Sequence, residues 1–217
     1  MIVGPAIYGA WMSKSFALLM AFAMLAVAPE PASADGYSDG MDAYFAGKYK
    51  TAAKLLLPAA EAGNALAQYQ MGVMYDAGQG VHQNSLAAIA YYRVAAESDP
   101  RAQVALADRL MLGRDIAHDQ KAAIDWYRKA AARADLTALL RLAIAYRDGQ
   151  GVPKDIVLAH VFASKQIGKL DNMDRRRLSM KLRLTPEQLA ESKALQDTWD
   201  WPMRDELPTE SKTGAVP

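Results

Sequence analysis

The chain contains no cysteine among its 217 residues. Without a thiol it can form no disulfide, no cysteine nucleophile, no thiolate metal site and no lipid-modified cysteine anchor. An excess of charge is also missing, because 25 basic side chains are balanced by 24 acidic ones. A net charge of +1 creates no field that would attract nucleic acid or an anionic membrane, so neither is expected as a partner.

Residues with the chemistry of an active site are few. The three histidines, His82, His118 and His160, lie more than 30 residues apart, which is not the spacing of metal ligands. The glycines of Gly78-Gln79-Gly80 lack the preceding strand and the lysine of a phosphate-binding loop. The sequence therefore predicts no catalytic residue, no cofactor and no metal site.

The N-terminal 34 residues differ in composition from the rest of the chain. Lys14 precedes an apolar run from Phe16 to Ala28, and a small-x-small motif ends at Ala34, before Asp35. A basic start, a short apolar core and a small-residue cleavage motif are typical of a secretory signal peptide. We expect residues 1–34 to be removed between Ala34 and Asp35, and the mature protein to lie in the periplasm or to be secreted.

Two further points concern the same leader. Met12 is a candidate for the true start, because residues 1–11 add nothing that a signal peptide needs. The alternative is an uncleaved anchor that uses Ile2 to Ala28 as one apolar stretch. The core from Phe16 is shorter than the roughly 20 residues of a membrane span, which favours cleavage and a mature form without a span.

From Asp35 onward the chain is rich in alanine and leucine and repeats itself. Gly78, Gly113 and Gly149 lie 35 and 36 residues apart and end three similar segments. Matching small residues precede these glycines, and matching bulky residues follow them in a second helix. The aligned sets are Ala67, Ala102 and Ala138; Gly72, Ala107 and Ala143; Tyr75, Leu110 and Tyr146; Ala88, Ala123 and Ala159; and Tyr91, Trp126 and Phe162.

Each segment has the features of a helical hairpin. Small residues let two helices approach closely, and glycine permits the left-handed cap that ends a helix. Asn84 and Asp155 suit the start of the second helix. One hairpin cannot bury its own apolar face, whereas stacked neighbours can. The sequence therefore predicts an all-α fold, a superhelical solenoid of stacked helix-turn-helix hairpins with a C-terminal capping helix.

The organisation along the chain follows from this alignment. A threonine N-cap, a proline and a glutamine at 185–188 predict the start of the terminal helix. The predicted units are the signal peptide (1–34), a shorter tetratricopeptide-like starting hairpin (35–64), three repeats within 65–171 (about 65–100, 101–136 and 137–171), C-terminal capping helices (172–200) and a flexible tail (201–217).

Two motifs carry a family resemblance. The first runs from Gly72 to Val81, with tyrosine and two glycines at fixed spacing. The second, in the second helix of the next copy, is Trp126-Tyr127-Arg128-Lys129-Ala130-Ala131. It resembles the Sel-like repeat (SLR), a relative of the tetratricopeptide repeat, over residues 65–171. The middle copy departs from the pattern at Arg114-Asp115-Ile116, where a glycine and a valine belong. The resemblance implies a scaffold for protein–protein contacts, often exported in bacteria, with no general catalytic residues.

Helical geometry places one row of first-helix positions on the concave side of such a scaffold. We call these positions the predicted groove. It is apolar with charged edges, which suits a peptide or helix of a partner protein, although superhelix curvature could instead bury part of it. The predicted groove consists of Tyr69, Gln70, Val73, Asp76, Val104, Asp108, Met111, Leu140, Arg141, Ile144 and Arg147.

Two functions compete at this point. The first is an exported, non-catalytic scaffold that binds another protein in the bacterial cell envelope, in a regulatory or assembly role. The second is a cell-wall hydrolase or glycan-binding protein, for which Asp76 and Asp108 would have to converge as a carboxylate pair. A basic cluster at Arg175–Arg177, Lys181 and Arg183 could contact an acidic partner or a lipid headgroup, or could be a solvated helix face.

Overall fold

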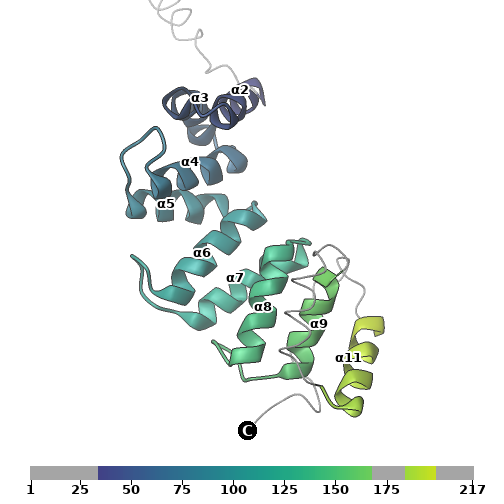
Figure 1. Ribbon diagram of the computed structural model, residues 1–217. Helices are drawn as coiled ribbons and strands as arrows, with labels where there is room; N and C mark the ends of the chain where they lie inside the picture. The colour runs from purple at the N-terminus through teal and green to yellow at the C-terminus, as the bar shows by residue number, and fades with distance from the viewer. Residues whose placement is uncertain (1–33, 168–183, 199–217) are drawn as a thin grey trace, which may run out of the picture.

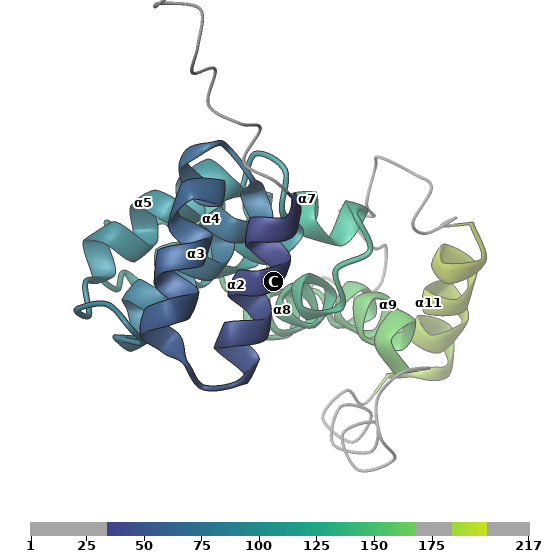
Figure 2. The ribbon, with the colours of Figure 1, turned by 90° about the horizontal axis from the view of Figure 1, so that it is seen from above.

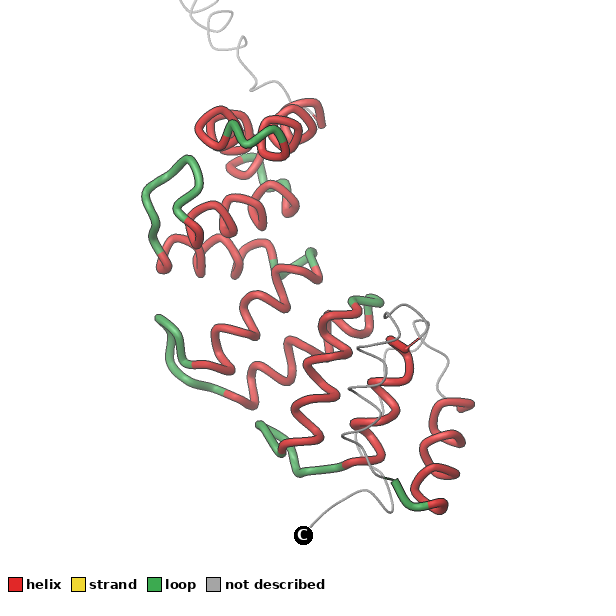
Figure 3. The backbone as a smooth tube through the Cα atoms, in the orientation of Figure 1, coloured by secondary structure: helices red, strands yellow, loops and turns green. Residues whose placement is uncertain are grey.

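The computed structural model describes residues 34–167 and 184–198. In these two ranges the regular elements are α-helices, joined by short loops (Figure 3). Their bounds are α2 (Ala34–Phe45), α3 (Tyr49–Glu61), α4 (Ala65–Ala77), α5 (Ser85–Ala95), α6 (Pro100–Leu112), α7 (Gln120–Ala132), α8 (Leu136–Asp148), α9 (Ile156–Ile167) and α11 (Pro186–Thr198).

The helices pair as hairpins that follow one another along a curved row (Figure 1). Helices α3, α5, α7 and α9 each pack on the helix before them, and α3, α5 and α7 also contact the first helix of the next hairpin. Seen from above, α2 to α5 lie at one end of the row and α9 and α11 at the other (Figure 2). The predicted all-α solenoid of stacked hairpins is confirmed.

The helix ends are those that the repeated residues predict. Gly78, Gly113 and Gly149 cap α4, α6 and α8 in the left-handed conformation, with φ of 68°, 62° and 75°. Asn84 begins α5, where its side chain accepts a hydrogen bond from the backbone N–H of Ala87. These caps satisfy backbone groups that a helix end leaves without partners, so they fix where each hairpin turns.

Small residues bring the two helices of a hairpin together. Ala67, Ala102 and Ala138 are all fully buried. At Gly72, a Cβ would lie 2.5 Å from the ring of Tyr92, which is closer than van der Waals contact permits. A large side chain at this position would separate α4 from α5, so the small residues set the spacing of the helices and the aromatic residue fills the space between them.

The middle repeat keeps its geometry although it lacks the second glycine. Asp115 takes that place with a φ of 60°. Aspartate tolerates this left-handed region better than most residues. Its carboxylate also lies 3.4 Å from the Arg109 guanidinium of the same hairpin. The departure at residues 114–116 therefore changes the side chains of the turn and leaves the course of the backbone similar.

The terminal helix α11 begins as predicted. The backbone N–H of Thr185 donates to Gln188 Oε1 at 3.0 Å, and the N–H of Gln188 donates to Thr185 Oγ1 at 3.3 Å, which is the reciprocal capping box. The helix packs against α9, and Leu195 joins the core there. Ser192 Oγ is buried and lies 2.8 Å from His160 Nδ1.

We expect acid to weaken the docking of α11. Burial lowers the pKa of His160 below its ordinary value, so the folded state favours the neutral ring. This contribution to stability is present above the unfolded pKa, about 6.5, and is lost as the pH falls through the folded value. Between pH 7.5 and 5, the free energy of unfolding should fall more in the natural protein than in His160→Gln, as measured by urea titration. Equal decreases would contradict this role of His160.

Several predictions fall outside the described residues. They are the signal peptide before Ala34, the basic cluster at 175–183 and the tail at 201–217. Asp35 and Ala34, the residues at the predicted cleavage point, lie at the start of α2. Within the described ranges, no helix combines the length and the apolar character that crossing a bilayer requires.

Candidate partner-binding surface

The predicted groove lies on α4, α6 and α8, the first helices of three successive hairpins. Nine of its eleven residues are partly exposed, so a partner could reach them although each is also packed against its neighbours. The nine are Tyr69, Val73, Asp76, Asp108, Met111, Leu140, Arg141, Ile144 and Arg147.

Gln70 and Val104 differ from the other nine, because each is only 7% exposed. Val104 packs into the apolar cluster that α7, α8 and α9 share, so stacking of the next hairpin covers it. Gln70 is enclosed as well, and its Nε2 has no hydrogen-bond partner among the described residues. These two residues offer almost no surface to a partner, and the accessible part of the predicted groove is formed by the remaining positions.

Ion pairs connect the helices along this surface. Arg109 of α6 is buried and pairs with Asp76 of α4, one hairpin earlier. In the same way, Arg141 of α8 reaches back to Asp108 of α6: its Nη2 donates to Asp108 Oδ2 at 2.9 Å, and its Nε lies 2.8 Å from Oδ1. Each pair joins two repeats, so the charged edges of the predicted groove hold neighbouring hairpins in a fixed relation.

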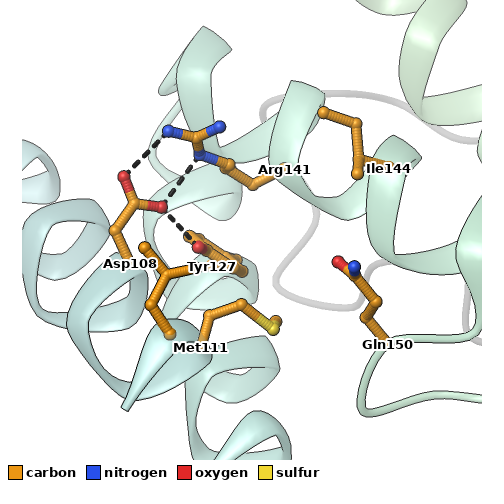
Figure 4. A pocket seen from close by; sticks show the side chains of 7 residues that line it. Asp108, Met111, Tyr127, Arg141, Ile144 and Gln150 are labelled. Carbon is orange, nitrogen blue, oxygen red and sulfur yellow. Dashed lines mark hydrogen bonds and ion pairs between the residues drawn. The ribbon is translucent and has the colours of Figure 1, made fainter. Parts of the chain in front are cut away.

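A pocket of about 170 Å³ opens between α6 and α8 (Figure 4). Four residues of the predicted groove line it: Asp108, Met111, Arg141 and Ile144. The other lining residues are Leu112, Tyr127 and Gln150. Asp108 and Arg141 face each other on one wall, and Gln150 lies on the other side. These four residues, which the repeat alignment assigns to one face of α6 and α8, therefore lie around one pocket in the structure.

Tyr127 forms the polar end of this pocket. Its hydroxyl donates to Asp108 Oδ1 at 2.5 Å, and the ring is buried beneath α6 and α8. Burial and then the hydrogen bond to Asp108 raise the pKa of Tyr127, so the phenol keeps its proton near neutral pH. Asp108 thus accepts from Tyr127 and from Arg141 at once, which holds the carboxylate still.

The residues that a hydrolase would need do not come together in this way. Asp76 and Asp108 are each engaged by a different arginine of the following hairpin. Ser192 and His160 do form a hydroxyl–imidazole contact, but Ser192 is 0% exposed and cannot meet a substrate. His82 and His118 are exposed, and the described residues contain no group of three side chains suited to hold a metal ion.

Comparison with known proteins identifies the repeats. The family model of the Sel1 repeat matches residues 34–64, 65–99, 100–135 and 136–165. The chain belongs to the Sel1 repeat family. The first of these matches covers the shorter hairpin that precedes the three repeats aligned from the sequence.

The solved structures that resemble this Sel1 repeat chain include the following two, and a search of curated proteins finds no match. A Sel1 repeat protein from Oxalobacter formigenes is 29% identical with a TM-score of 0.63, over 68% of this chain and 59% of that one. A protective antigen of uropathogenic Escherichia coli that displays an SLR fold is 24% identical with a TM-score of 0.42, over 76% of this chain and 46% of that one. The chain thus spans less than two thirds of either relative.

Sel1 repeat proteins are generally scaffolds for protein–protein interaction and are generally non-catalytic. In this member, two functional features were not predicted from the sequence. Gln68 and Gln103 occupy the same repeat position, and each donates its Nε2 proton to a carbonyl of the preceding hairpin, at Ala60 and Ala96. The recurrence of glutamine was a usable signal. Gln150, by contrast, is known as a pocket residue only from the structure.

Proposed function

We propose that this protein is an exported, non-catalytic scaffold of the bacterial cell envelope that binds a segment of another protein on the accessible part of the predicted groove. One observation carries the proposal: Asp108, Met111, Arg141 and Ile144, from two successive hairpins, gather around one open pocket. A surface of this kind, apolar with fixed polar groups, suits the side chains of a partner. The two aspartates of the rival carboxylate pair, Asp76 and Asp108, are each paired with a different arginine.

Export is supported by the leader. The apolar run from Phe16 to Ala28 ends six residues before Ala34, and the first Sel1 repeat begins at residue 34. Cleavage after Ala34 would remove only the first residue of α2 and leave the later hairpins unchanged. The alternative remains an uncleaved anchor formed by the same apolar residues.

An alkaline phosphatase fusion to residues 1–40 tests export. We expect activity in the periplasm, since the enzyme requires an oxidising compartment, and mass spectrometry of the mature protein should show Asp35 as its first residue. Leu19→Arg with Leu25→Arg interrupts the apolar core and should retain the fusion in the cytoplasm. A natural leader that leaves the fusion cytoplasmic would contradict export, and a product that keeps residues 1–34 would favour the anchor.

Capture of partners from an envelope extract tests the binding surface. Ile144→Asp with Val73→Asp should reduce recovery of the specific partner by about tenfold or more, because two buried carboxylates would have no compensating charge in the complex. The matched control is Leu86→Asp with Val94→Asp, which places the same charges on exposed positions of α5. Circular dichroism verifies that both variants fold. Equal recovery with both variants would exclude the predicted groove as the binding surface.

A further inference from the structure

The pocket between α6 and α8 lies at a junction where a leucine replaces the tyrosine found at the same repeat position in the first hairpin. At the junction of the first two hairpins, Tyr44 donates its hydroxyl proton to Gln79 Oε1 at 3.0 Å, which ties the glycine turn to the preceding hairpin. Gln150 follows the glycine of its own turn as Gln79 does, but the residue corresponding to Tyr44 is Leu110. Leucine has no hydroxyl, and the Gln150 carboxamide makes no hydrogen bond to another described residue. At the pocket, the amide group of Gln150 is thus not engaged by any residue that the structure describes.

The size of the pocket restricts what can enter it. Its volume of about 170 Å³ is close to that of an engineered protein cavity of about 150 Å³ that binds benzene. Sites for drug-sized molecules occupy about 300–1,000 Å³. The pocket thus has room for one side chain.

The charge of the lining selects the kind of side chain. Asp108 and Arg141 are its two charged residues, and they neutralise each other. The remaining lining is Met111, Leu112, Ile144, Tyr127 and Gln150, all uncharged at neutral pH. A charged side chain would lose its hydration here without gaining a net counter-charge, whereas an apolar one would gain from burial.

The remaining hydrogen-bonding groups suit a peptide main chain. Arg141 directs Nε and Nη2 toward Asp108, which leaves N–H groups of the guanidinium for a carbonyl oxygen, and its side chain is 41% exposed. Gln150 on the opposite side supplies both a donor and an acceptor, the same pair that one peptide unit presents. Together the two residues can hold an extended chain whose side chain enters between them.

We propose that this pocket binds a single uncharged apolar side chain of the leucine or methionine class, carried by an extended segment of the partner, while Arg141 and Gln150 bond to the flanking peptide groups. This rests on the proposed scaffold function and names the chemistry of its partner. Leu112, which is 65% exposed, forms the apolar rim over which the segment passes.

Blocked tripeptides of the form acetyl-Ala-X-Ala-N-methylamide test the proposal by methyl NMR on the mature protein. Peptides with leucine or methionine at X should shift the methyl signals of Met111 and Ile144. Their affinity should exceed that of the lysine and glutamate peptides by at least about tenfold, from the burial of one apolar side chain. No shift with any peptide, or equal affinity for lysine or glutamate, would overturn the proposal.

Variants then assign the binding to this pocket. Ile144→Trp fills the space and should abolish the shift of the Met111 methyl group, whereas Leu86→Trp on exposed α5 should not. Gln150→Ala should weaken binding about fivefold, the worth of one hydrogen bond, and Gln79→Ala should leave it unchanged. Insensitivity to both pocket variants would overturn the proposal. Capture that depends on the predicted groove without a leucine preference would overturn it too, yet leave the scaffold function standing.

Discussion

Gly80→Ala should lower the free energy of unfolding by roughly 3 kcal/mol, one of the largest effects expected of a single methyl group in this protein. Gly80 has a φ of +74°, where an alanine is strained whatever its surroundings. A Cβ at this position would also lie 2.2 Å from the backbone oxygen of Tyr49. Tyr49 is in the first turn of α3, so its carbonyl cannot move without disturbing that helix.

The matched control is Gly47→Ala. Gly47 has a φ of +72°, nearly that of Gly80, but a Cβ there would meet nothing within 4 Å. Its substitution should cost only the conformational strain, about 1 kcal/mol. Urea denaturation with linear extrapolation measures both costs. If the two variants were equally destabilised, the contact between Gly80 and Tyr49 would contribute nothing, and left-handed strain alone would explain both glycines.

This contact also shows what the sequence could and could not predict about the fold. The spacing of the first glycines predicted the helix caps, because a C-cap depends on the local chain. The second glycine of the turn, Gly80, also has a positive φ. Its larger role is tertiary: the turn of one repeat lies against the start of the second helix in the repeat before it. Gly151 repeats the arrangement against the backbone of Gln120, with a Cβ distance of 2.6 Å.

The sequence likewise predicted one part of the predicted groove and missed another. Helical phase was enough to bring Asp108, Met111, Arg141 and Ile144 together, since residues three or four apart share a face of the helix. It was not enough to expose Val104, because the next hairpin packs over that position and encloses it in the core. The Tyr127–Asp108 hydrogen bond joins two different positions of the repeat. Alignment of the repeats matches equivalent positions only, so it could not predict this contact between side chains.

Sequence alignment also treats Tyr91 and Phe162 as equivalent, and the structure agrees on their ring contacts. Tyr91 stacks on Tyr75 with centroids 5.6 Å apart, and Phe162 stacks on Tyr146 with centroids 5.5 Å apart. Their burial differs, because Tyr91 is only partly buried whereas Phe162 is 0% exposed. Leu195 of α11 packs against the cluster that contains Phe162, so the terminal helix completes the burial that no further repeat supplies.

Phe162→Ala should therefore cost about 4 kcal/mol, the usual range for a fully buried phenylalanine, and Tyr91→Ala about half as much or less. The stacking contact is lost in both variants, so the difference between them reflects chiefly how far each ring is buried. Urea denaturation of the two variants gives that difference directly. Equal costs would mean that the covering of α9 by α11 adds little to the stability of the last hairpin. A larger cost at Phe162 would show that the solenoid depends on its C-terminal cap. Residues at equivalent repeat positions would then contribute differently to the free energy of unfolding because different helices pack beside them.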